Sequence, residues 1–170
     1  MTNSRIFVFI VYFVVLVLLQ VLVLNRMELS RWVSPFIYPL FVLLLPFDVP
    51  RWLVLLLSFA IGLSVDTFSN TLGIHTAATV FMGYMRHGII TLMRPQADYQ
   101  PDDQPSLGIM GFRWFATYAA LCVFVHHAIC FLLEYFSLYY IGDVFIKTVC
   151  SATLSLAMIL LWEYFFYNKP

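Results

Sequence analysis

The chain has 170 residues, of which 62% are hydrophobic and only 11% are charged. A soluble domain typically carries about 25% charged residues, so this composition indicates an integral membrane protein and argues against a soluble domain. The net charge is zero and no cluster of Lys and Arg could follow a phosphate backbone, which argues against a nucleic-acid partner. We expect a single all-α domain over 1–170, folded as a bundle of membrane-spanning helices.

The first apolar run, Ile6–Leu24, is interrupted only by Gln20. A helix needs about 20 residues to cross the hydrocarbon layer, and this run is long enough. It is too long for the core of a signal peptide and has no small-residue cleavage site, so we expect it to remain as the first span.

The second apolar run, Trp32–Phe47, is short and contains three prolines, Pro35, Pro39 and Pro46. Proline removes a backbone donor and kinks a helix, which a membrane tolerates when neighbouring helices cover the break. We expect a short, kinked span that is shielded by protein. The alternative is a re-entrant hairpin.

Four further runs complete the predicted bundle: Trp52–Ser69, Gly73–Leu92, Leu107–Leu133 and Val144–Tyr167. The sequence therefore predicts about six transmembrane helices, or five if the second run is re-entrant. The stretch over 95–106 holds three prolines and three aspartates and predicts a solvated cytoplasmic loop.

The distribution of Lys and Arg predicts the orientation. With six spans, both termini share one side of the membrane. That side collects six cations: Arg5, Arg51, Arg86, Arg94, Arg113 and Lys169. The opposite side has three: Arg26, Arg31 and Lys147. The excess places both termini in the cytoplasm.

Asp66 is the most informative ionisable residue, because it lies near the outer boundary of the hydrocarbon in the third predicted span. A carboxylate there is costly unless it is paired, hydrated or faces protein. It either marks the outer end of the helix in water, or acts as a polar anchor in the bundle or toward a partner helix. Gly62 and Gly73 flank it, His75 begins the next span, and Gly83 follows, so this hairpin predicts close helix packing.

Cys122, His126, Cys130 and Glu134 recur every four residues in the fifth predicted span. One helix cannot place four ligands around a tetrahedral metal ion, so we expect no metal and no cofactor. His126 and His127 are predicted to form interhelical hydrogen bonds, and their 100° separation should direct them to different neighbours. No nucleophile motif, phosphate loop or paired carboxylate accompanies these residues, so we do not expect an enzyme.

Residues 62–78, GLSVDTFSNTLGIHTAA, resemble the most distinctive segment of the MreD family of rod-shape-determining membrane proteins. The family pattern has Gly-Leu, an Asp, a short polar stretch, Leu-Gly and a small-residue helix. The segment is about a tenth of the chain, and the remainder agrees in length and hydropathy.

The resemblance implies a non-enzymatic scaffold of the cell-elongation complex in the bacterial cytoplasmic membrane. It implies a direct partner, MreC, and less direct partners in MreB, RodZ, RodA and a class B penicillin-binding protein, with no small-molecule substrate. A vitamin-binding subunit of an energy-coupling-factor importer is the alternative, since such subunits are equally small and hydrophobic. An enclosed, polar-lined pocket opening outward would favour that alternative.

Overall fold

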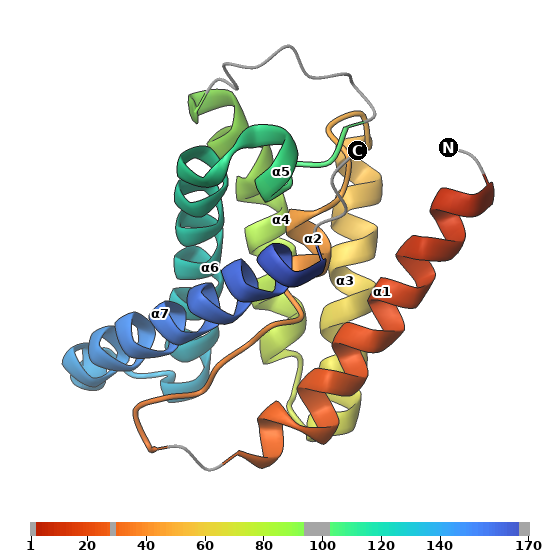
Figure 1. The fold of residues 1–170 in the computed structure, drawn as a ribbon. Helices are drawn as coiled ribbons and strands as arrows, with labels where there is room; N and C mark the ends of the chain where they lie inside the picture. The colour runs from red at the N-terminus through yellow and green to blue at the C-terminus, as the bar shows by residue number, and fades with distance from the viewer. Residues whose placement is uncertain (1–2, 28–29, 94–102, 167–170) are drawn as a thin grey trace.

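The fold is all-helical in the part of the chain that the computed structural model describes, residues 3–27, 30–93 and 103–166 (Figure 1). The longer helices are α1 (Asn3–Leu22), α3 (Arg51–Ser69), α4 (Ile74–Met93), α6 (Phe112–Tyr135) and α7 (Ile141–Phe166). Short helical turns lie between them: η1 (Leu24–Arg26), α2 (Leu40–Leu43), α5 (Leu107–Met110) and η2 (Leu138–Tyr140).

Four segments are long and apolar enough to cross a membrane: Ile6–Arg26, Arg51–Ser69, Phe112–Tyr135 and Ile141–Phe166. They correspond to the first, third, fifth and sixth predicted spans. The fourth predicted span forms α4, which has 20 residues but is less apolar because Arg86 and His87 interrupt it. The expectation of an all-helical fold is therefore confirmed, and four segments have the length and hydropathy expected of membrane spans.

Glycine and asparagine with positive φ determine where several helices end. Asn70 ends α3 in the left-handed conformation with a φ of 54°, and Gly73 precedes α4 with a φ of 86°. Gly111, with a φ of 79°, separates α5 from α6 and so breaks the fifth predicted span near its start. These conformations are the ones that glycine and asparagine adopt at least cost.

The second predicted span differs from the expectation. Only Leu40–Leu43 is helical, and most of residues 34–47, which we name the central segment, has no regular structure. Every residue from 35 to 46 is nevertheless buried. In Figure 1 the segment passes through the bundle from the lower end of α1 toward the upper end of α3. The prediction of a kinked helix is wrong for most of this run, whereas the prediction of shielding by protein is confirmed.

Side chains of the surrounding helices satisfy the backbone of the central segment. Three of its N–H groups donate to α1 and α7: Ser34 to Ser151 Oγ at 2.9 Å, Phe36 to Ser155 Oγ at 2.8 Å, and Ile37 to Gln20 Oε1 at 2.9 Å. Two of its carbonyls accept from α6 and α4: Leu43 from Tyr118 Oη at 3.1 Å, and Leu45 from the Arg86 guanidinium. Backbone without regular structure is tolerated at membrane depth only when it is buried and satisfied in this way.

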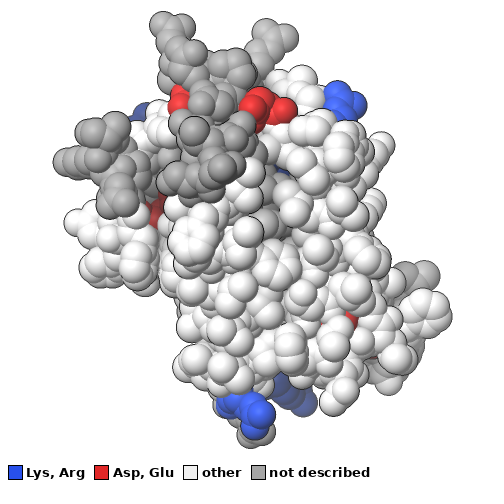
Figure 2. All heavy atoms as spheres, turned by 90° about the vertical axis from the view of Figure 1, so that its right-hand side faces the viewer, with Lys and Arg blue, Asp and Glu red and all other residues white. Residues whose placement is uncertain are grey.

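The surface is apolar between two charged ends. On the face in Figure 2, Lys, Arg, Asp and Glu gather mainly near the ends, and the band between them is almost free of charge. Many large apolar side chains in the helices are exposed, among them Phe7, Trp52 and Phe145. This is the distribution expected of helices that face lipid. Residues 95–102 of the predicted polar loop, Arg94 and Lys169 lie outside the described residues.

Candidate functional site

Asp66 joins the end of α3 to the start of α4. The residue is buried, with only 3% of its surface exposed. One carboxylate oxygen accepts from the backbone N–H of His75 at 3.1 Å and from the Thr71 hydroxyl. The other accepts from the N–H of Thr76 at 2.7 Å and its hydroxyl at 2.5 Å. Asp66 therefore caps the N-terminus of the neighbouring helix, where free N–H groups and the helix dipole favour a negative charge.

Gly62 and Gly83 allow α3 and α4 to pack closely. A Cβ atom at Gly62 would lie 2.6 Å from the Cα of Thr76, and one at Gly83 would lie 2.4 Å from Ser58 Oγ. Neither position can take a larger side chain without displacing its neighbour. Both glycines therefore face other residues of this chain, as expected for packing within the bundle.

A buried polar cluster lies where the central segment meets α4 and α6. The Tyr38 hydroxyl is 2.7 Å from His126 Nε2 and 3.1 Å from His75 Nδ1. The Thr79 hydroxyl donates to the His75 carbonyl at 2.6 Å. His126 is completely buried, and its Nδ1 has no hydrogen-bond partner among the described residues. The cluster thus holds the central segment to two helices.

His127 points to a different helix from its neighbour, as the 100° separation predicts. Its Nε2 lies 3.0 Å from Ser155 Oγ on α7, and its Nδ1 lies 2.8 Å from the Val123 carbonyl. Both histidine rings nevertheless pack against Phe36, with centroid distances of 5.8 Å for His126 and 5.0 Å for His127. The two polar groups diverge, but both rings share one apolar neighbour in the central segment.

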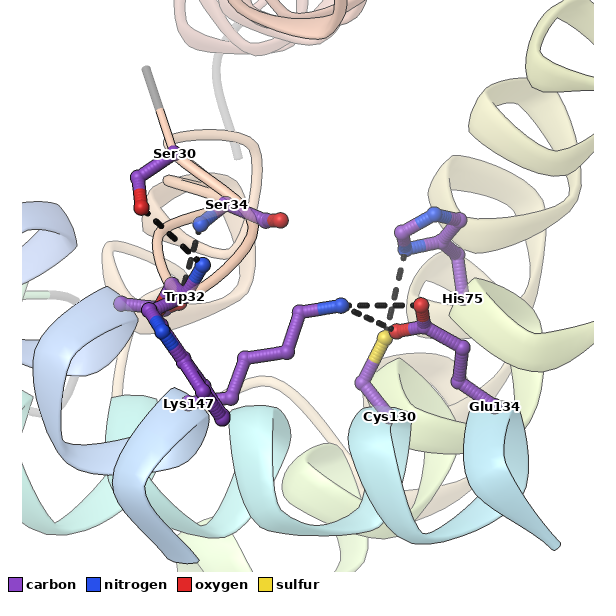
Figure 3. A network of polar contacts seen from close by, with 8 residues as sticks. Ser30, Trp32, Ser34, His75, Cys130, Glu134 and Lys147 are labelled. Atoms are coloured by element: carbon purple, nitrogen blue, oxygen red, sulfur yellow. Dashed lines mark hydrogen bonds and ion pairs between the residues drawn. The ribbon is translucent and has the colours of Figure 1, made fainter. Parts of the chain in front are cut away.

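A pocket of about 860 Å³ lies between the start of the central segment and the adjacent ends of α3, α4 and α6. These helix ends are at the lower end of the bundle in Figure 1. Lys147 reaches into it from α7 and contacts both Glu134 oxygens, at 2.8 and 2.9 Å (Figure 3). The ammonium also lies 4.6 Å from the centre of the Phe131 ring. Lys147 is only 7% exposed, so this ion pair forms part of the pocket wall.

Further polar lining of this pocket comes from η1, the end of α3, α4, α6 and the chain from residue 30 to residue 34. His75 is 7% exposed, and its Nδ1 lies 3.8 Å from the Cys130 sulfur. Arg26 and Arg31 are exposed at the pocket, and the Arg31 guanidinium lies 4.4 Å from the centre of the Trp32 ring. The pocket therefore combines cations, one carboxylate and a histidine at one end of the molecule.

The Cys, His and Glu residues that recur every four positions in the fifth predicted span have different neighbours in the structure. Cys122 is buried in the core, Cys130 lies beside His75, and Glu134 pairs with Lys147. Within the described ranges, no group of three or more His, Cys, Asp or Glu side chains is placed to hold a metal ion.

A groove of about 770 Å³ lies at the surface between α3 and α4, toward their other ends. Arg51 and His87 contact each other across it at 2.5 Å, and Tyr84 and Gly88 line it. Gly88 is exposed, and a Cβ atom there would meet nothing within 4 Å. The backbone of α4 is therefore accessible at this point.

Three buried charged residues are not singled out by the sequence pattern. Arg86, predicted to mark a cytoplasmic helix end, is only 4% exposed and donates to Tyr118 Oη at 2.9 Å. Lys147 pairs with Glu134 in the pocket wall. The Glu163 carboxylate accepts a hydrogen bond from the Leu107 N–H at 3.1 Å. Their location within apolar runs is the signal that could have identified them, because a charge there requires a protein partner.

No family model, curated protein or solved structure matches this chain. The features that bear on function are therefore those of the chain itself: the capped α3–α4 hairpin, the groove beside it and the pocket at the opposite end.

Proposed function

We propose that this chain is a multi-pass scaffold subunit of the MreD type, which binds MreC in the bacterial cytoplasmic membrane. Through MreC it would help to couple peptidoglycan synthesis to MreB, together with RodZ, RodA and a class B penicillin-binding protein. The resemblance over 62–78 supports this proposal, because those residues form the hairpin in which Asp66 caps α4 and Gly62 allows close packing.

The proposal includes six membrane crossings with both termini in the cytoplasm. Five crossings would be helical, through α1, α3, α4, α6 and α7, and one would be made by the central segment. The support is that α1, the central segment, α3, α4 and α6 run between the two ends of the molecule in alternating directions (Figure 1). The excess of Lys and Arg on the side of the termini supports the orientation.

The mechanism is positional. The α3–α4 hairpin is a rigid unit, since buried hydrogen bonds fix its turn and its two helices are in close contact at both glycines. A rigid surface can hold the single membrane helix of a partner in one register. The observation that carries the proposal is the groove beside this hairpin, where exposed Gly88 leaves the α4 backbone open to another helix. Small residues at such positions permit close helix approach in a membrane.

The test is co-purification of tagged MreC with a Gly88→Leu variant. Leucine at this position would fill the groove, so we expect the yield of MreC to fall at least about tenfold, which corresponds to ~1.4 kcal/mol. Gly142→Leu is the matched control, because Gly142 is also an exposed helical glycine with nothing within 4 Å of its Cβ position. It should retain MreC at the wild-type level. Wild-type recovery of MreC with Gly88→Leu, at equal membrane expression, would contradict the proposed groove.

A substrate-binding importer subunit is the second candidate function, and the polar pocket beside Lys147 is the observation that favours it. A volume of about 860 Å³ is in the range of small-molecule sites. Mass spectrometry of the purified protein separates the two functions: a stoichiometric vitamin retained through purification, together with failure to recover MreC, would favour the importer subunit.

A further inference from the structure

Among the described residues that line the pocket at the lower end of the bundle, cations outnumber carboxylates. Its described lining includes three cations, Arg26, Arg31 and Lys147, and one carboxylate, Glu134. Lys147 and Glu134 contact each other through both carboxylate oxygens, so their charges largely compensate. Neither arginine has a carboxylate partner among the described residues. Because apolar walls and charges of one sign concentrate the electrostatic field in a cleft, the remaining charge favours an anion.

Half of the described residues that line the pocket are apolar, and three of these are phenylalanines. Phe36 and Phe131 are buried beneath it, Ile74 is half-buried, and Phe68 is 64% exposed at its edge. Sites for small organic molecules combine apolar and aromatic walls with polar groups that orient the ligand. An inorganic ion would use the cations but leave these walls uncovered.

His75 supplies a further polar group to the pocket lining. The Tyr38 hydroxyl and the Cys130 sulfur both lie near its Nδ1, which orients the ring. Its Nε2 makes no hydrogen bond within the described residues and is not one of the buried atoms left without a partner, so it keeps access to the pocket. A ligand oxygen or nitrogen in the pocket could satisfy this atom.

We propose that this pocket binds a small amphipathic organic anion. Its carboxylate or phosphate group lies at Arg26 and Arg31, its apolar body lies against Phe36, Phe68 and Phe131, and a polar atom of the ligand reaches His75. Arginine suits this role because its planar guanidinium donates two parallel hydrogen bonds to carboxylates and phosphates. The pocket is at the opposite end of the molecule from the groove at Gly88, so the inference does not depend on the scaffold function. The headgroup of an anionic lipid shares this chemistry and is the second source of such a ligand.

The test compares 1-naphthylacetate with its neutral amide, 1-naphthylacetamide, by isothermal titration calorimetry. The full chain is held in nanodiscs of phosphatidylcholine, so that no anionic lipid competes. We expect the acid to bind at least about tenfold more tightly than the amide, because only the acid forms charge-assisted hydrogen bonds with arginine. In the Arg26→Gln/Arg31→Gln variant, the affinity for the acid should fall to that for the amide. Arg113→Gln, an exposed arginine at the opposite end, should bind the acid as the wild type does.

Repeating the titration in nanodiscs with one part in three of phosphatidylglycerol identifies the natural source of the anion. Weaker binding of the acid shows that a lipid headgroup occupies the site, whereas unchanged binding indicates a soluble anion. The inference is overturned if the wild type does not bind the acid or binds acid and amide equally. It is also overturned if the double arginine variant keeps wild-type affinity for the acid. The comparison of acid with amide uses the wild-type protein alone, so it does not depend on the folding of any variant.

Discussion

Asp66 shows how an ionisable residue can be accommodated near the end of a helix that is long and apolar enough to span a membrane. The cost of burying a carboxylate is offset by four donors, two of them backbone N–H groups that would otherwise be unsatisfied at the start of α4. The residue type and its depth in the third apolar run were sufficient to single out Asp66. Its partners could not be inferred, because they depend on how the hairpin at Gly73 folds back.

Replacement of Asp66 by leucine should therefore destabilise the fold. The substitution leaves the N–H groups of His75 and Thr76 without acceptors in a buried position. We expect the free energy of unfolding to fall by at least about 2 kcal/mol, from the loss of a helix cap and the cost of unpaired donors. Equilibrium unfolding in mixed dodecylmaltoside and SDS micelles measures this change.

Asp48→Leu is the control for this measurement, because Asp48 is exposed in the turn before α3. The stability of this variant should remain within about 0.5 kcal/mol of the wild type. Equal losses in the two variants would show that Asp66 contributes only its charge and not a cap for α4.

At the scale of elements, the central segment is the largest departure from a simple bundle. Its prolines remove backbone donors and oppose a continuous helix, which the sequence indicates. The side chains that replace helical hydrogen bonds come from α1, α4, α6 and α7, far away in the sequence. The short apolar run could therefore be recognised as buried, but its extended path could not be predicted.

Ser155 on α7 is a critical support for the central segment. Its hydroxyl oxygen accepts from the Phe36 N–H at 2.8 Å and lies 3.0 Å from His127 Nε2. Ser155→Ala should leave the Phe36 N–H unsatisfied and lower stability by about 1–3 kcal/mol. Hydrogen exchange measured by mass spectrometry should also show faster exchange in peptides that cover residues 35–45.

Thr153→Ala is the matched control on the same helix. Its hydroxyl is exposed and bonds only to the Val149 carbonyl of its own helix. This variant should change neither the stability nor the exchange of the central segment. If both variants exchange alike, α7 does not hold the segment through Ser155.

At the scale of the whole molecule, the path of the central segment determines the topology. If it crosses the membrane, Met27 and Asn70 lie on one side, and Asp48 and Arg113 lie on the other. If it is re-entrant instead, Asp48 lies on the same side as Met27. The number of crossings thus depends on one segment that has little helix.

Single cysteines at these four positions test the topology. Each single cysteine is introduced into a variant in which alanine replaces Cys122, Cys130 and Cys150, the free cysteines of the described residues. A membrane-impermeant maleimide applied to whole cells should label cysteines at Met27 and Asn70. Those at Asp48 and Arg113 should react only after the cells are opened. Labelling of the Asp48 position in intact cells would rule out six crossings.

The amino-acid sequence by itself determined the class of protein and the approximate bounds of most helices, because these depend on the local density of apolar residues and on the helix-ending preferences of glycine and asparagine. It also indicated the polar hairpin at Asp66 and the divergence of His126 and His127, which follow from helical spacing. Only the tertiary structure decided the extended path of the central segment, the burial of Arg86 and the pairing of Lys147 with Glu134. The apolar runs around Arg86 and Lys147 indicate that each needs a protein partner. Which partner each one meets, and the path of the central segment, depend on contacts between side chains from distant parts of the chain, which no local pattern specifies.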